Sequence, residues 1–85
     1  MNLETVWPML AEKRRFRRVD WAEKAFIFLV PGSRFTVNRE PLLSILGEGT
    51  VVNYEPHVDV CHGNGTIGVY VPEVSDLTAD DWEEI

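Results

Sequence analysis

Residues 51–71 read VVNYEPHVDVCHGNGTIGVYV, and this stretch decides the fold. The segments Val51–Cys61 and Thr66–Val71 are rich in β-branched residues, which predicts two strands. Between them lies Gly63-Asn64-Gly65, and Asn-Gly is the strongest short-range signal for a hairpin because both residues tolerate a positive φ. Pro72 stops the second strand. The stretch therefore predicts an antiparallel pair.

Two more strands precede this hairpin in the chain. Arg15–Trp21 alternates apolar and polar residues, which predicts a half-exposed strand. Ala25–Val30 is continuously apolar, which is typical of a more buried strand. A turn is predicted at Pro31-Gly32-Ser33, and an extended segment at Phe35-Thr36-Val37.

Helical patterns lie at both ends and in the middle. Four apolar residues at i, i+3, i+4 and i+7 predict an N-terminal helix ending near Lys13: Leu3, Val6, Trp7 and Leu10. Asn2 or Thr5 can cap it, and a start near Thr5 would keep Pro8 in the first turn. A short second helix is predicted after Pro41. Thr78–Asp81 predicts one helical turn capped by Thr78, followed by an edge strand over Trp82–Ile85.

These elements predict a single α+β domain over residues 1–85. Its N-terminal helix packs on a mostly antiparallel sheet of about five strands. A chain of 85 residues has a thin core, and self-association commonly compensates for that. We therefore expect a homo-oligomer.

Charge is distributed unevenly along the chain. The net charge is −6, but residues 1–39 carry +4 and residues 40–85 carry −10, with no Lys or Arg after Arg39. The two halves can attract each other within one fold or across a subunit interface. Alternatively, the basic run at residues 13–18 meets phosphate. We expect no duplex nucleic-acid partner, because the acidic half would repel it.

Several other functional classes are disfavoured. The longest apolar run is far too short to cross a membrane, and no signal-peptide pattern opens the chain. We therefore expect a cytoplasmic location and no membrane partner.

A metal-like cluster comprises His57, Asp59, Cys61 and His62. It lacks the paired spacing of zinc sites, so we expect no metal. Cys61 with a nearby histidine lacks any sign of activation as a nucleophile, so we expect no enzyme. The acidic residues after Thr78 look like a solvated terminal segment. No motif indicates a cofactor.

What remains is a set of residues suited to binding. Trp21 follows a strand beside polar residues, where its indole can stack on a base or simply complete the core. Arg17 and Arg18 point to opposite faces, and one of them can hold a phosphate. The loop with Ser75, Asp76 and Thr78 can contact ribose hydroxyls, although turn and cap chemistry explains it equally well.

The stretch Phe28–Arg39 is distinctive. So is an ordered set of short segments: Arg18-Val19-Asp20-Trp21, Pro56-His57-Val58-Asp59, Gly65-Thr66-Ile67, Ser75-Asp76-Leu77 and Ala79-Asp80-Asp81-Trp82-Glu83. Together they resemble the Thoeris anti-defence protein two family of small phage and prophage proteins, over nearly the whole chain. The resemblance implies that the protein sequesters a cyclic nucleotide immune messenger without cleaving it. The implied messengers are a glycosyl-cyclic ADP-ribose isomer and cyclic dinucleotides. The implied assembly is a homotetramer with pockets between subunits, in the bacterial host cytoplasm during phage infection.

The resemblance also implies a set of ligand-binding residues: Arg18, Trp21, Ala25, Phe26, Tyr70, Ser75, Asp76 and Thr78. Trp21 would stack on the base. Trp82, in the terminal Asp-Trp pair, is mainly structural. Two pairs depart from the family pattern, Ala22-Glu23 and Val69-Tyr70, and both lie near the expected pocket. A buried Tyr70 hydroxyl would need a hydrogen-bond partner.

Two alternatives remain at this stage. One is a structural or virion-associated module whose tryptophans and arginines only pack subunits together. The other is an enzyme that degrades such messengers, which the lack of a base and nucleophile pair disfavours.

Overall fold

The computed structural model describes residues 1–22 and 24–85. Glu23, half of one departure from the family pattern, lies outside the described residues. The elements in chain order are α1 (Leu3–Met9), the 3-10 turn η1 (Leu10–Glu12), β1 (Phe16–Arg18), β2 (Phe26–Val30), β3 (Ser33–Thr36), α2 (Leu42–Leu46), β4 (Val51–Tyr54), β5 (His57–Cys61), β6 (Ile67–Val69), α3 (Val74–Thr78) and β7 (Trp82–Glu84). The predicted α+β class with an N-terminal helix is confirmed.

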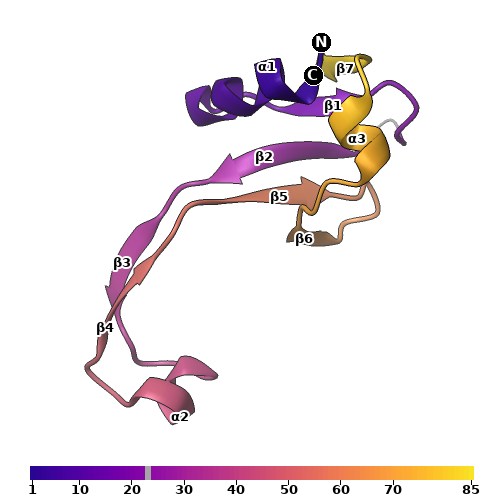
Figure 1. Cartoon of the computed structure of the whole chain (residues 1–85). Helices are drawn as coiled ribbons and strands as arrows, with labels where there is room; N and C mark the ends of the chain where they lie inside the picture. Colours follow the sequence, from indigo (N-terminus) through magenta and orange to yellow (C-terminus); the bar gives the residue numbers. More distant parts are fainter. Residues whose placement is uncertain (23) are drawn as a thin grey trace.

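A five-stranded antiparallel sheet forms the body of the molecule. Its strands run in the order β6-β5-β2-β1-β7 (Figure 1). The predicted hairpin around Asn64 is confirmed, since β5 pairs with β6 on either side of it. The last strand, β7, is an edge strand as predicted, and it pairs with β1 rather than with its neighbours in sequence.

The core lies between α1 and one face of this sheet. Three residues of the predicted helical stripe are buried, Leu3, Val6 and Leu10, and they pack with side chains that include Phe16 and Ile27. Burying such apolar side chains is the main favourable contribution to folding. The fourth residue of the stripe, Trp7, lies at the edge of this core and is 44% exposed.

Helix α1 begins at the first of the two caps that the sequence offered. The Asn2 side chain caps it by accepting a hydrogen bond from the Thr5 N–H at 2.9 Å. The helix therefore starts at Leu3, and Pro8 lies inside it. Of the two predicted caps, Asn2 is therefore confirmed and Thr5 is not used. The short helix tolerates the loss of the hydrogen bond that Pro8 cannot make.

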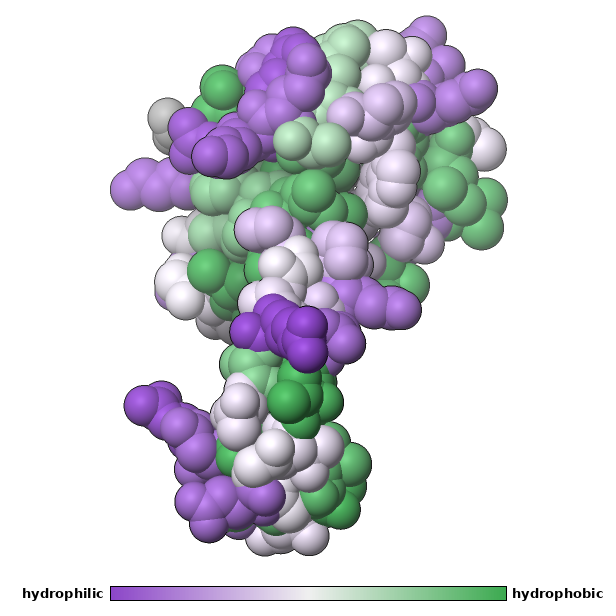
Figure 2. Space-filling view, turned by 90° about the vertical axis from the view of Figure 1, so that its left-hand side faces the viewer, coloured by the Kyte–Doolittle hydropathy of each residue, from purple (hydrophilic) through white to green (hydrophobic). Residues whose placement is uncertain are grey.

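Residues 31–56 form an arm that leaves the body of the molecule. The ribbon of β3 and β4 carries α2 at its far end, and Figure 1 shows it projecting from the end of β2. The predicted strand Val51–Cys61 is divided at Glu55-Pro56 into β4 of the arm and β5 of the sheet. In Figure 2 the arm is a separate lobe below a narrow neck, with hydrophobic residues gathered along one side.

The C-terminal helix lies before its predicted place. Helix α3 covers Val74–Thr78, so Thr78 ends a helix and does not cap one, and Ala79 is extended. The predicted turn over Thr78–Asp81 was therefore wrong. The Asp76 side chain accepts from the Glu73 N–H at 3.0 Å, which stabilises the first turn of α3 instead.

None of the helices in the described part of the chain has the length and hydrophobicity needed to cross a bilayer.

Candidate functional site

A cavity of about 570 Å³ opens at the end of the sheet where β2 begins and β5 ends. This volume is within the range of small-molecule sites. Six of the eight residues expected to bind ligand line it: Arg18, Trp21, Ala25, Tyr70, Ser75 and Asp76. They come from β1, from the segment between β1 and β2, from the residue that follows β6, and from α3. Residues far apart in sequence thus meet around one space.

The other two expected residues lie elsewhere. The Phe26 ring borders a different hollow, where the Arg15 guanidinium lies 5.0 Å from its centroid. The Thr78 hydroxyl donates to the Val74 carbonyl at 3.1 Å, within α3. Side chains on successive residues of a strand point to opposite faces, which explains why Ala25 and Phe26 separate.

Two aromatic rings form one side of the cavity. Trp21 is half-buried, and its ring centroid lies 6.1 Å from that of Tyr70 in an edge-on arrangement. Trp82 supports Trp21 from the core at 5.2 Å, also edge-on. The predicted strand Arg15–Trp21 was too long, since β1 ends at Arg18 and a turn brings Trp21 to the cavity.

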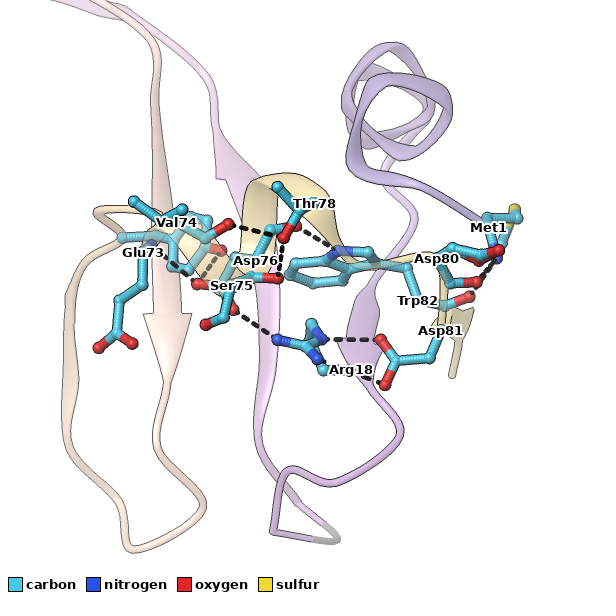
Figure 3. A network of polar contacts seen from close by, with 11 residues as sticks. Met1, Arg18, Glu73, Val74, Ser75, Asp76, Thr78, Asp80, Asp81 and Trp82 are labelled. Carbon is cyan, nitrogen blue, oxygen red and sulfur yellow. Dashed lines mark hydrogen bonds and ion pairs between the residues drawn. The ribbon is translucent and has the colours of Figure 1, made fainter.

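Asp76 is the centre of the polar side. Its Oδ1 accepts from Arg18 at 3.1 Å, and its Oδ2 accepts from the Tyr70 hydroxyl at 2.8 Å and from the Glu73 N–H. The Asp76 carbonyl accepts from the Trp82 indole N–H at 3.2 Å (Figure 3). The Tyr70 hydroxyl thus has the partner that its burial requires.

Protonation at Asp76 follows from these contacts. Burial acts to raise the pKa of the Asp76 carboxyl, but the hydrogen bonds from Glu73, Tyr70 and Arg18 outweigh it and hold the pKa below its ordinary value. Burial and the same bond raise the pKa of the Tyr70 hydroxyl. Asp76 is therefore a carboxylate and Tyr70 a neutral phenol at pH 7.

Arg18 lies between two carboxylates. Its Nε donates to Asp81 at 2.7 Å, opposite the bond from NH1 to Asp76 (Figure 3). The bonds to Asp81 and Asp76 raise the Arg18 pKa despite burial, so the charge is permanent. Three of the five guanidinium N–H groups are used, which leaves two that can donate to a ligand.

Carboxylates near the C-terminus also neutralise Arg14 and Arg17. Arg14 pairs with Glu84 at 2.6 Å, and Arg17 pairs with Glu83 at 2.9 Å. Asp81, Glu83 and Glu84 remain partly exposed to solvent, as the sequence predicted, but they are also ion-pair partners, which the sequence did not indicate. The alternative in which the two halves of the chain attract each other within one fold accounts for these pairs.

The metal-like cluster of the sequence is not assembled into a site. His57 Nε2 lies 3.4 Å from Asp59 Oδ1 on β5, and across residues 1–22 and 24–85 no three His, Cys, Asp or Glu side chains converge as metal ligands would.

Sequence reasoning missed several lining residues. Asp20 and Glu73 add carboxylates to the cavity, and His62 borders it from the end of β5. Asp20 follows Arg18 by two residues, so its position beside Trp21 was a usable signal. Glu73 had no such signal, because its place depends on where α3 begins.

Comparison with protein families gives a match over the entire chain. The family model described as Thoeris anti-defense 2-like domain matches residues 1–85. The chain belongs to this family. A comparison with curated proteins finds no match.

In this Thoeris anti-defense 2-like domain, the second departure from the family pattern has a structural role. Tyr70 is buried, its hydroxyl bonds Asp76, and its ring lies 6.5 Å from that of Trp7 and 6.3 Å from that of Trp82. Tyr70 therefore joins the core to the cavity, and its phenol holds Asp76 in place.

Proposed function

We propose that this Thoeris anti-defense 2-like domain binds a cyclic nucleotide immune messenger in the cavity beside Trp21 and holds it without cleaving it. The messenger would be a glycosyl-cyclic ADP-ribose isomer or a cyclic dinucleotide. The observation that carries the proposal is the meeting of an aromatic side and a hydrogen-bonding side around one cavity of nucleotide size.

Stacking on Trp21 would supply much of the affinity. The indole borders the cavity, and its edge contacts with Tyr70 and Trp82 fix its orientation. A base stacked on an aromatic side chain gains about 1–3 kcal/mol. A ring already held by its neighbours loses little freedom on binding, which favours tight capture.

Polar contacts would come from α3 and β1. Ser75 is exposed and borders the cavity, Asp76 Oδ1 keeps one acceptor position beside its bond to Arg18, and Arg18 keeps two donors. These groups suit ribose hydroxyls and a phosphate oxygen. Asp76 can accept fewer hydrogen bonds from ribose than the sequence suggested, because donors of the protein occupy most of its acceptor positions.

Capture without turnover fits the same chemistry. A general base works best with a pKa near the operating pH. The pKa of Asp76 is held low by its three donors, after opposition from burial, so this carboxylate is poorly suited to that task. We propose accordingly that the protein is not an enzyme. From the family resemblance, we also propose that it acts in the host cytoplasm and assembles as a homotetramer.

Calorimetry with cyclic ADP-ribose and cyclic di-GMP as probes tests the proposal. The unmodified protein should bind at least one probe, and Trp21→Ala should weaken that binding by about 5- to 150-fold, which corresponds to the loss of one stacked base. Chromatography of the heat-released probe should return it intact.

Trp21→Phe is the matched variant, since it keeps a flat ring and a smaller stacking surface. It should bind between the unmodified protein and Trp21→Ala, and circular dichroism should show both variants folded. Undiminished binding by folded Trp21→Ala would refute the assignment of the cavity. Failure of every probe to bind would favour the purely structural alternative, and a hydrolysed probe would show an enzyme.

A further inference from the structure

Two hydrogen-bonded ribbons follow one another along the same pair of chain segments. The ladder of β2 and β5 ends at the pair Val30 and His57, and the ladder of β3 and β4 begins at the pair Ser33 and Tyr54. Two residues separate these pairs on each strand, so both ribbons share one register and neither strand carries a bulge between them. The division into arm and body therefore does not arise from an inserted residue.

The residues between the two ladders explain the interruption. The shared register places Pro31 opposite Pro56 and Gly32 opposite Glu55, and we call these four residues the neck. A proline has no N–H, so neither member of the first pair can donate a hydrogen bond to the other strand. All four residues are described by the structure, and none of them belongs to a strand. The neck thus lacks the strand pairing that stiffens the ribbon on either side of it.

The arm is held together by contacts of its own. Val37 is buried, its N–H donates to the Thr50 carbonyl at 2.8 Å, and its carbonyl accepts from the Gly49 N–H at 3.1 Å. The rings of Phe35 and Tyr54 stack with their centroids 5.5 Å apart. Among the described residues, the core cluster of the body does not include Val37. The arm is therefore a small unit in itself, and movement relative to the body is concentrated in the neck.

Gly32 lets the neck turn while its two strands stay in contact. A glycine has the widest choice of φ and ψ, so it can absorb a change in backbone direction. Its backbone lies so near the other strand that a Cβ would be 2.7 Å from the Tyr54 carbonyl oxygen and 3.1 Å from Pro56 Cδ. This close approach keeps the two strands side by side, so the arm turns as one piece and its strands do not splay apart.

The dimensions of the chain amplify a small rotation at the neck. The molecule is 46 Å long with extents of 26 and 22 Å across, and Figure 2 shows the arm as a lobe below a narrow neck. Six residues of extended chain span about 20 Å, so a rotation of about 15° moves the far end of the arm by roughly 5 Å. The cavity lies where β2 begins, at the opposite end of that strand from the neck (Figure 1). Such a rotation therefore leaves the cavity unchanged.

We propose that the neck is a hinge, about which the arm pivots as a rigid unit while the body and its cavity keep their structure. Pro31 and Pro56 make the hinge by removing the donors of one pair, and Gly32 absorbs the change in backbone angles. Hinges in proteins are built from a few residues at the ends of elements, as here. The hinge lets the chain present the tip of the arm, α2, over a range of angles. It stands on the backbone of the chain and does not depend on the proposed function.

Distances between spin labels, measured by double electron–electron resonance, test the hinge in the folded chain. In a Cys61→Ser background, labels at Ile45→Cys on the arm and Ile67→Cys on the body span the neck, and both sites are exposed. Labelled chains are mixed with an excess of unlabelled chains, so that only distances within one chain contribute. The distance distribution should be at least about twofold wider than for Val19→Cys/Ile67→Cys within the body or Arg34→Cys/Ile45→Cys within the arm. Equal widths for the three pairs would overturn the hinge.

Restoring the missing donors tests the cause of the hinge. Pro31→Val/Pro56→Val returns an N–H to each strand and allows one continuous ladder, so the width measured across the neck should fall by about half. Pro72→Val is the matched control, because it makes the same substitution in the body, after β6, and it should leave that width unchanged. An unchanged width in the double variant, with the width within the body also unchanged, overturns the role of the prolines. If the double variant does not fold, the three widths measured with the unmodified neck decide the proposal.

Discussion

Replacing Asp76 by Asn tests whether this carboxylate holds the C-terminal segment to the sheet. The substitution keeps the shape of the side chain but removes its charge and one of its acceptors. At least one of the three donors that converge on it, from Arg18, Tyr70 and Glu73, would then face an N–H group. A buried donor without a partner costs free energy because it has lost its hydration.

The magnitude follows from the surroundings of this residue. Breaking a buried charge pair by removing one partner costs about 3–5 kcal/mol. Asp81 still neutralises Arg18 after the substitution, and the Asn side chain keeps an oxygen acceptor. We therefore expect the free energy of unfolding to fall by about 2–3 kcal/mol. For a domain of this size, that lowers Tm by about 10–20 °C.

Urea unfolding monitored by tryptophan fluorescence, at one fixed protein concentration, measures this loss. Glu48→Gln is the matched control, because Glu48 is an exposed carboxylate on the arm, and it should change the free energy by less than about 0.5 kcal/mol. If Asp76→Asn is no less stable than this control, the network around Asp76 does not contribute to stability as argued.

The same residues predict a dependence on pH. Hydrogen bonds, opposed by burial, lower the native pKa of Asp76, and the bond from Arg18 lowers that of Asp81. A carboxyl with a lowered native pKa stabilises the fold above its unfolded pKa, near about pH 4, and this stability is lost as the pH falls through the native value. The free energy of unfolding should therefore fall below about pH 4, and less steeply in Asp76→Asn.

Three further substitutions test local features, each measured by thermal unfolding. Asn2→Ala removes the cap of α1 and should cost about 1 kcal/mol; no loss would show that the cap is dispensable. Gly32→Ala should cost about 1–3 kcal/mol, because the new Cβ would lie 2.7 Å from the Tyr54 carbonyl oxygen at the base of the arm; a neutral result would mean that this backbone shifts freely. Tyr70→Phe removes one hydrogen bond to Asp76 and should cost about 1.5–3 kcal/mol, and a cost much below that would show that the bond is not made.

The body of the fold was predictable because its signals are local. Asn64 at the hairpin, the apolar run of β2 and the stripe of α1 each depend on a few neighbouring residues. The arm was not predictable in the same way. Pro56 separates β4 from β5 along the chain, but a proline at this point fits a bulge in one sheet as well as a strand that leaves it. Which of the two occurs depends on packing that no short segment encodes.

The residues that line the cavity were more predictable than the hydrogen bonds between them. Trp21 and Asp76 were expected to bind ligand, and both border the same space. That Arg18 joins Asp76, 58 residues away, depends on how β1, β7 and α3 pack together. Sequence spacing contains no information on such a contact, so the competing bonds at Asp76 could be found only in three dimensions.

Most arginines of the basic run are engaged in ion pairs within the fold. Residues 13–18 looked like a phosphate-binding surface, but Arg14, Arg17 and Arg18 are paired with carboxylates of the C-terminal segment. Each pair is only partly buried and adds little stability by itself. Together they align β7 on β1, and they neutralise Arg18, the arginine that lines the cavity. The positive charge of this run that suggested anion binding is thus partly neutralised within the fold, by contacts between residues far apart in the sequence.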